Sequence, residues 1–525
     1  MNKTASAYIV IAAGILSLFV CVTIFRPLMP VDETRYMSVA WEMMQQGNWI
    51  LPTLNYEAYS HKPPLLFWLI RGTWSIFGVD VWPVRILMLG LMAAFLFLTQ
   101  CFGRALAQRQ ESDPGHTGIQ AMLMLSALPL YLIYGTTIMF DTMMGLCVVG
   151  AMILLWRIAQ GSRWALWFGF GALLGIGILA KGPVALLYML PPAFLVRLWR
   201  GEIPGGWFKG LAMAILTGAM IGLAWAVPAA LSGGDAYAEK IFVTQSAGRM
   251  VNAFDHREPL WFYIPVLAGF LAPLLLIPNL WSSIKTGLKT PQKKQALYFV
   301  LSWVLPVFLF FSLINSKQIH YMIPILPGFA ALAALSLSGR EIKSVVMPLA
   351  VMLLPSIVVI FYEVLETPFM GMKLPESAEH LGYAHIILSI LIMMWAKYGL
   401  GRDHAQVALA MGAFVMVFMI HAQLGDRFLP KYDLSPLAAA VEPYKARPMA
   451  AAPKYDGEYG FVMRMTKPIT SIGREKEEVA NWFAANPDGI ILLRYKNPDQ
   501  VADYNVLYTQ PFRPKEYLSI VEKRP

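Results

Sequence analysis

The segment 30–68 gathers charged and aromatic side chains directly after the first apolar run of the chain. Its ionisable residues include Asp32, Glu33, Arg35, Glu42, Glu57, His61 and Lys62. A membrane protein is expected to keep charged groups together next to a span when they bind something or react with it, since elsewhere in the membrane such groups are costly and rare. A carboxylate there can serve as a general base, and a lysine can neutralise a phosphate. We therefore interpret this segment as the polar half of an active site on the bilayer surface.

Asp32 and Glu33 stand at the start of a predicted helix that ends near Met44. The apolar residues of this helix recur on one face, as in a helix that lies in the membrane interface. One interpretation is that Asp32 only caps the helix. A carboxylate can cap a helix and also react, so Asp32 is the candidate catalytic residue, with Glu33 and Arg35 as candidate substrate-positioning residues.

Tyr59, His61 and Lys62 come just before Pro63 and Pro64, which restrict the local backbone and begin the next apolar helix. A lysine held at the membrane surface by such a turn suits the phosphate of a lipid-linked substrate. The alternative is a lysine that only reaches toward the headgroups. Tyr59 and His61 are candidate substrate-positioning residues.

Asp141 lies between residues that would otherwise belong to a membrane span. An isolated carboxylate at such a place predicts a functional site. The alternative is that Asp141 and the neighbouring Thr142 form a polar cap on the next span. We take Asp141 as a second candidate catalytic residue.

Two later polar loops add basic groups on the same predicted side of the membrane. In the first loop, Arg249 is a candidate phosphate ligand, because a guanidinium offers a fork of donors. His256 is a candidate positioning residue in this loop, and contact with lipid headgroups is the alternative. In the second loop, Lys317 and Tyr321 are four residues apart and could face the same way on a helical turn. Lys317 would add a third cation for the phosphate, unless it only anchors the end of a span.

The composition is that of a polytopic membrane protein. Of 525 residues, 57% are hydrophobic and 14% are charged, and the mean hydropathy is +0.54. A soluble protein of this length would have roughly 25% charged residues. The net charge of +10 lies mostly in short loops between apolar runs, which indicates membrane orientation rather than nucleic-acid binding. The three cysteines have no metal-ligand spacing and predict no disulfide framework.

The apolar runs predict an all-α membrane domain of about thirteen transmembrane helices over residues 1–424. They lie near 8–25, 82–101, 118–136, 142–157, 164–180, 183–198, 211–230, 260–280, 297–314, 322–338, 344–362, 383–398 and 406–424. Basic residues recur in alternate loops, and the positive-inside rule places those loops in the cytoplasm. The candidate site residues and the C-terminal tail then lie on the periplasmic side of a bacterial inner membrane.

Residues 425–525 differ in composition and predict a small soluble periplasmic α/β domain. Ser435 and Pro436 are typical of a helix start. The pattern predicts a helix over Glu475–Ala485 and short strands at Phe461–Met465, Ile490–Arg494 and Asn505–Tyr508. We find no catalytic motif in this part of the sequence.

The motifs resemble those of the GT-C superfamily of membrane glycosyltransferases, above all the lipid A aminoarabinose transferases and the protein O-mannosyltransferases. The resemblance rests on DETRY at 32–36, GNW-x-x-P at 47–52, KPPL at 62–65, Asp141, AKGP at 180–183, HREPLWFYIP at 256–265 and SK-x-x-x-Y-x-x-P at 316–324. These motifs fall within roughly residues 8–330. A soluble domain after the membrane spans also resembles the aminoarabinose-transferase branch.

This resemblance implies an inverting transfer of a sugar from an undecaprenyl-phosphate-type donor, on the external face and without a nucleotide. Asp32 would be the main catalytic carboxylate, and Asp141 would match the second-loop aspartate. Lys62 and Arg249 would hold the donor phosphate, and Lys317 matches the last motif by position, as does Tyr321.

Two departures from the family pattern concern metal binding. His61 stands where aminoarabinose transferases commonly have glutamate, and Gln245 stands where they often have histidine. The sequence itself shows no required cofactor, and a divalent metal remains open.

The acceptor that the resemblance favours is lipid A, with a protein or a polysaccharide as the alternative. A transporter or flippase of lipid-linked sugars would also explain the spans and the basic loops. It does not explain why carboxylates and basic groups gather on one face. A structural envelope protein leaves the whole constellation unexplained. The expected partners are therefore a polyprenyl-phosphate-linked sugar, lipid A or another envelope glycan, and membrane lipid, without nucleic acid.

Overall fold

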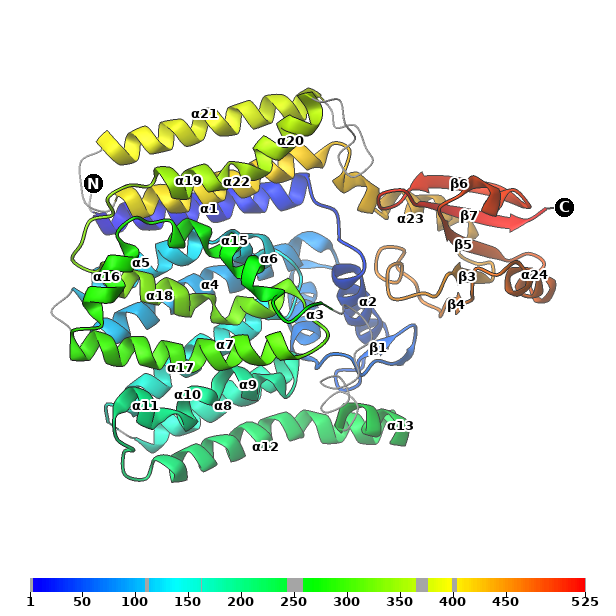
Figure 1. Ribbon diagram of the computed structural model, residues 1–525. Coiled ribbons are helices and arrows are strands. Elements are labelled where there is room, and N and C mark those ends of the chain that lie inside the picture. Colours follow the sequence, from blue (N-terminus) through cyan, green and yellow to red (C-terminus); the bar gives the residue numbers. More distant parts are fainter. Residues whose placement is uncertain are drawn as a thin grey trace.

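The structure is a computed structural model that describes residues 3–108, 113–161, 163–242, 258–364, 376–398 and 404–524. Long helices that run roughly side by side form the larger part, and a small sheet lies beyond one end of them (Figure 1). The predicted class, a helical membrane protein with a small C-terminal α/β region, is confirmed.

Nine helical segments within the described residues are long and apolar enough to cross a membrane. They are α1 (Lys3–Ile24), α4 (Val81–Ala107), α7 (Asp141–Ile158), α8 (Trp164–Lys181), α12 (Trp207–Gly233), α17 (Pro291–Leu313), the run η2 (Ile319–Ile325) with α18 (Leu326–Leu337), α21 (Glu376–Tyr398) and α22 (His404–Gly425). Each helix satisfies its own backbone hydrogen bonds, which a bilayer requires.

The remaining predicted spans are bent or broken in the structure. Two are bent pairs, α5 (Pro114–Ser126) with α6 (Pro129–Gly135) at 74° and α15 (Tyr263–Leu275) with α16 (Leu280–Gly287) at 90°. Two more are runs of short helices: α9 (Val184–Met189), α10 (Pro191–Phe194) and α11 (Val196–Arg200), then α19 (Val346–Met352) and α20 (Leu354–Val364). Proline lacks a backbone N–H and interrupts a helix, as Pro191 and Pro192 do here. The number of thirteen therefore stays a prediction.

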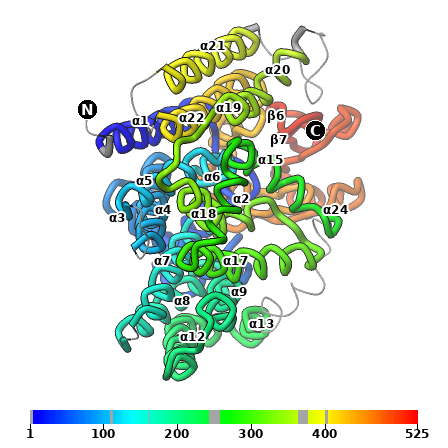
Figure 2. The backbone as a smooth tube through the Cα atoms, turned by 60° about the vertical axis from the view of Figure 1, so that its left-hand side comes forward, coloured from blue at the N-terminus to red at the C-terminus, as the bar shows by residue number. Residues whose placement is uncertain are grey.

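Burial separates the central helices from the outer ones. In the membrane-spanning stretch of α7, 78% of the residues are buried by other parts of the protein, whereas the share in α12 is 28%. A helix that is apolar on all sides and largely uncovered is expected to face lipid, whereas a covered one forms the core. Helices α1 and α22, from distant parts of the chain, pack side by side (Figure 2). The first residue of α7 is Asp141, and its side chain is buried with the rest of this core helix.

The segment after α1 forms a compact cap on the ends of the long helices. It contains α2 (Asp32–Gln45), the two-stranded hairpin of β1 (Thr53–Leu54) and β2 (Glu57–Ala58), and α3 (Leu65–Phe77). Ten residues of α2 are buried, from Glu33 to Met43. The helix that the sequence analysis expected at the interface is thus covered by protein, with α3 among its neighbours.

The C-terminal region contains a five-stranded mixed sheet in the order β4-β3-β5-β7-β6. Its elements are α23 (Ser435–Val441), β3 (Met449–Ala452), β4 (Thr470–Ser471), α24 (Lys476–Ala485), β5 (Ile490–Tyr495), β6 (Tyr504–Pro511) and β7 (Tyr517–Lys523). β3 runs parallel to β4 and β5, and β7 runs antiparallel to its two neighbours. Apolar side chains are buried on both faces of the central strands.

Most of the elements predicted for this region are confirmed. Helix α23 begins at Ser435 with a proline in its first turn, α24 occupies the predicted helix, and β5 and β6 contain the predicted strands. The strand predicted at Phe461–Met465 is wrong. The Met463 and Met465 amides donate to the Tyr459 and Gly460 carbonyls, so this stretch forms tight turns.

Candidate functional site

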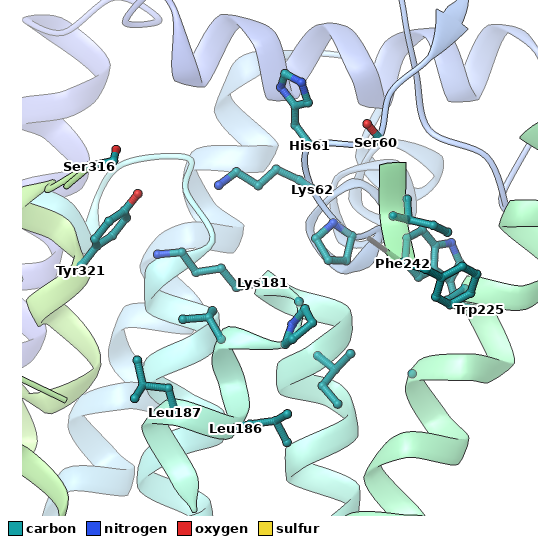
Figure 3. Close-up of a pocket in the computed structure, with 18 of the residues that line it drawn as sticks. Ser60, His61, Lys62, Lys181, Leu186, Leu187, Trp225, Phe242, Ser316 and Tyr321 are labelled. Atoms are coloured by element: carbon teal, nitrogen blue, oxygen red, sulfur yellow. The ribbon is translucent and has the colours of Figure 1, made fainter. Parts of the chain in front are cut away.

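A cavity of about 1050 Å³ lies where α2, the turn before α3, the α8–α9 junction, α12, α17 and η2 meet. Its polar end contains the first turn of α2 and the residues 59–63. Its other end is lined by aliphatic and aromatic side chains of the long helices. Figure 3 shows this division, with Lys62 and Lys181 above Leu186 and Leu187.

Asp32 presents a solvent-accessible carboxylate to the cavity. Its side chain is 46% exposed, and Arg35 Nη1 lies 3.9 Å from its Oδ1. The Tyr36 hydroxyl donates to the same oxygen at 3.3 Å. Burial, with Asp32 as the next cause, holds the pKa of Tyr36 well above 10, so the phenol stays protonated as a donor. Asp32 does not act as a side-chain cap of α2, because the N-cap is Val31 and Asp32 lies in the first helical turn.

Two ammonium groups point into the polar end. Lys62 and Lys181 come from different elements, and both extend toward the side where Tyr321 and Ser316 lie (Figure 3). Lys62 Nζ is 5.6 Å from the centre of the Phe140 ring, and Lys181 Nζ is 4.6 Å from that of Tyr321. The two cations make this end suitable for a phosphate.

His61 and Tyr59 line the same end of the cavity. Their ring centres are 5.1 Å apart, and Tyr59 is largely buried. The structure thus brings together six predicted site residues: Asp32, Arg35, Tyr59, His61, Lys62 and Tyr321.

Asp141 lies behind the cavity wall rather than in it. Its side chain is 3% exposed, and its Oδ1 accepts a hydrogen bond from Lys181 Nζ at 2.5 Å. His320 Nε2 is 3.9 Å from the other carboxylate oxygen. Lys181 and His320 line the cavity themselves. Asp141 is therefore bonded to a residue that lines the cavity but is not itself among the lining residues, and its catalytic role stays a prediction.

Lys181 and His320 are site residues that the sequence analysis did not single out. Lys181 belongs to the AKGP motif at the end of an apolar run, on the predicted side of Asp32, which was the available signal. Gly182 follows with a φ of +81°, a backbone conformation that glycine adopts at little cost. This turn ends α8 and lets Lys181 face the cavity.

Two predicted site residues have internal partners and do not line the cavity. Lys317 is buried, and its Nζ donates to the carbonyls of Glu258 and Ile314 at 2.8 and 2.6 Å. Glu33 is 3.1 Å from Arg26 and accepts the Met29 amide at 2.9 Å. Both side chains hold the segments that carry the site.

Arg249 and His256 lie outside the described residues, as does Gln245. Within the described part of the chain, no three His, Cys, Asp or Glu side chains gather as a metal site.

The apolar end of the cavity reaches the outer surface of the helices. Ile178 from α8, Gly222 and Leu223 from α12, and Phe310 from α17 contribute to its lining. Leu223 and Phe242 are 48% and 45% exposed. In a protein that spans a bilayer, such side chains are expected to meet lipid tails. The cavity can therefore hold a charged head and an apolar tail at once.

The C-terminal region braces the helix that carries Asp32. Ser38 Oγ donates to the Gly457 carbonyl and accepts the Phe461 amide, both at 2.9 Å. Trp41 Nε1 donates to the Met465 carbonyl at 2.8 Å. Nearer the cavity, Arg35 Nε donates to a backbone carbonyl of the same loop at 2.7 Å. We define residues 455–469 as the brace loop.

Ser38→Ala is expected to lower the free energy of unfolding by about 1–3 kcal/mol, because a buried amide and a buried carbonyl lose their partner. Chemical unfolding of the full chain in detergent measures the change. Ser75→Ala is the control, since the exposed Ser75 bonds only within α3. Equal stability of the two variants would contradict a bracing role.

Comparisons with known proteins agree with the motifs. A family model described as dolichyl-phosphate-mannose-protein mannosyltransferase matches residues 61–231. An undecaprenyl phosphate-alpha-4-amino-4-deoxy-L-arabinose arabinosyl transferase from Enterobacter sp. (strain 638) is 28% identical over 419 residues, 76% of this chain and 72% of the relative. A protein of the same name (transferase 2) from Proteus mirabilis is 28% identical over 347 residues. That match spans 64% of this chain but only 60% of the relative's length.

A solved structure is similar over nearly the whole chain. The crystal structure of ArnT from Cupriavidus metallidurans bound to undecaprenyl phosphate superposes with a TM-score of 0.76 and 17% sequence identity. The superposition covers 99% of this chain and 98% of that one. The motifs, the sequence relatives and the shared fold together confirm that this chain resembles the GT-C membrane glycosyltransferases of the aminoarabinose-transferase and O-mannosyltransferase kinds.

Proposed function

We propose that this chain is an inverting glycosyltransferase that moves a sugar from a polyprenyl-phosphate donor to an envelope acceptor. The acceptor that we propose is lipid A. The observation that carries the proposal is that the cavity of about 1050 Å³ combines a lysine-lined polar end with an apolar end that opens to the outside of the helices. A polyprenyl phosphate has the same two parts. The names of the arabinosyl transferase relatives, and the undecaprenyl phosphate bound to ArnT, support this choice.

The proposed reaction exchanges one bond at the anomeric carbon of the sugar. The acceptor oxygen attacks that carbon, and the bond from the carbon to the phosphate oxygen breaks. The polyprenyl phosphate leaves with the bonding electrons and an added negative charge. Lys62 and Lys181 stabilise this charge electrostatically. We keep Arg249 as a further predicted phosphate ligand.

Asp32 is the proposed general base when the acceptor is a hydroxyl, and it takes the proton that the acceptor loses. When the acceptor is a phosphate, no strong base is needed. Asp32 then positions the acceptor or stabilises the positive charge that develops on the sugar ring. Arg35 and Tyr36 keep the carboxylate oriented in either case.

The proposed setting is a bacterial inner membrane with the cavity on the periplasmic side. Residues 1–424 form the transmembrane catalytic domain, and residues 425–525 form a periplasmic domain. Basic residues in alternate loops support this orientation. The end of α22 at Gly425 supports the boundary.

Envelope lipids of a deletion strain and of the restored strain test the acceptor. We expect mass spectrometry to show a pentose- or hexose-sized addition to lipid A only when the gene is restored. Unchanged lipid A under inducing conditions would contradict a lipid A acceptor. A protein acceptor is the second candidate, because the mannosyltransferase family model matches 61–231. Transfer by purified protein in detergent excludes a flippase, since transport needs a sealed membrane.

A further inference from the structure

A second cavity, of about 410 Å³, lies between the end of α1, the start of α4 and the C-terminal region. It shares no lining residue with the first cavity. Three arginines line it, Arg26, Arg85 and Arg464, and they come from three distant parts of the chain. Among the described residues that line it, Asp433 is the one carboxylate.

The two innermost guanidinium groups are buried and keep donors without partners. Arg26 is 6% exposed, and it donates to Glu33 and to Thr136, but its Nε has no hydrogen-bond partner. Arg85 is 8% exposed, and its Nη2 donates to the Arg26 carbonyl. No described residue forms an ion pair with Arg85. An arginine has five N–H donors, so Arg85 can take another acceptor from the cavity, whereas the Nε of Arg26 is enclosed by protein.

Arg464 closes the cavity from the brace loop. Its Nη2 donates to the Val79 carbonyl at 3.0 Å, and its guanidinium carbon lies 3.9 Å from the centre of the Phe461 ring. Within the described residues it has no ion-pair partner either. Asp433 accepts the Ser435 amide at 2.9 Å. Glu33 pairs with Arg26, and the carboxylates of Asp433 and Asp80 act on the other two arginines, so the case for an anion rests on their guanidinium donors rather than on net charge.

The cavity lies at the level where two long apolar helices end. Ile24, the last residue of α1, lines it and is 66% exposed. Trp82, in the first turn of α4, is 42% exposed. Exposed aliphatic and tryptophan side chains at helix ends are typical of the membrane interface, where lipid headgroups lie. The opening therefore meets headgroups rather than lipid tails.

We propose that this cavity binds a phosphate-bearing lipid headgroup through Arg85 and Arg464, with Arg26 as the residue that positions Arg85. Guanidinium groups bind phosphate oxygens through paired, charge-assisted hydrogen bonds. Arg26 contributes through its carbonyl, which accepts from Arg85 Nη2 and so holds that guanidinium at the cavity. The site does not depend on the proposed transfer reaction, and it shares no lining residue with the cavity that contains Asp32.

Binding to the full chain in detergent tests this site. Native mass spectrometry compares dioctanoyl phosphatidic acid with dioctanoylglycerol, which lacks the phosphate. A thermal-unfolding shift with inorganic phosphate, at constant ionic strength, forms the second arm. We expect phosphatidic acid to bind, Arg464→Gln to weaken it about tenfold, and Asp433→Asn to strengthen it by removing a like charge. Arg524→Gln is the matched control, since Arg524 is exposed and does not line the cavity.

The variants separate this cavity from the first one. Binding that falls in Lys62→Gln but not in Arg464→Gln would place the ligand in the first cavity and overturn the proposal. Equal binding of dioctanoylglycerol, or no gain in Asp433→Asn, would also overturn it. A variant-dependent shift with inorganic phosphate alone would identify free phosphate as the ligand, whereas a response to phosphatidic acid alone identifies the headgroup. No sugar transfer is measured, so the result is independent of the proposed function.

Discussion

Replacing Asp32 with asparagine is expected to lower the single-turnover rate of sugar transfer by a factor of about 10²–10⁴, the usual contribution of a general base. Asparagine has nearly the same shape and keeps an oxygen for the Tyr36 hydroxyl, which lies 3.3 Å from Oδ1. The substitution removes only the charge and the ability to accept a proton. The measurement uses purified full-length protein in detergent with a polyprenyl-phosphate sugar and lipid A.

Glu57→Gln is the control for this experiment. Glu57 lies in β2 of the same polar segment, is exposed and does not line the cavity. We expect its transfer rate to remain within about twofold of the wild type, as for a surface substitution away from the site. Near-normal turnover of Asp32→Asn would remove Asp32 from the mechanism. It would leave the reaction class intact, since donor binding depends on other groups.

Lys181→Met is expected to destabilise the protein by about 3–5 kcal/mol, because it leaves the Asp141 carboxylate buried without its partner. His320 does not take over the hydrogen bond to Asp141 from its present position, since its Nε2 is 3.9 Å from the carboxylate, beyond a normal hydrogen bond. The loss of one of the two lysines that line the cavity should also weaken binding of undecaprenyl phosphate. Chemical unfolding in detergent measures the first effect, and native mass spectrometry measures the second.

The double variant Asp141→Asn with Lys181→Met separates stability from binding. Removing both charges should restore most of the lost stability, since no buried charge remains unpaired. It should not restore phosphate binding, because the cation is still missing. Lys240→Met is the control, as Lys240 is exposed and does not line the cavity. Full recovery of phosphate binding in the double variant would contradict a phosphate-binding role for Lys181.

The pairing of Asp141 with Lys181 suggests a role for Asp141 that differs from the catalytic role predicted from the sequence. It was a candidate catalytic residue, whereas its carboxylate lies behind the wall, 2.5 Å from Lys181 Nζ. We propose that it is a positioning residue. The brace loop positions α2 in a similar way, through its hydrogen bonds to Ser38. The loop packs closely there, since a Cβ added at Gly460 would lie 2.9 Å from Ser38 Oγ.

The amino-acid sequence by itself determined the membrane class and one half of the site. Long apolar runs need no tertiary information, because the length of a helix that crosses a bilayer is set by the bilayer. Asp32, Tyr59, His61 and Lys62 could be grouped because they stand within one short polar segment next to a span. Charge is rare at such places, so its presence is informative by itself.

Only the tertiary structure decided which distant groups meet. Lys181 pairs with Asp141 across 40 positions of the chain, and no local pattern indicates that contact. The same holds for the cavity of Arg26, Arg85 and Arg464, which depends on how the C-terminal region packs against α1 and α4. The stretch Phe461–Met465 has the pattern of a strand but forms turns, because its amides bond locally and to Ser38. Local sequence sets propensity and polarity, whereas long-range packing selects the partners.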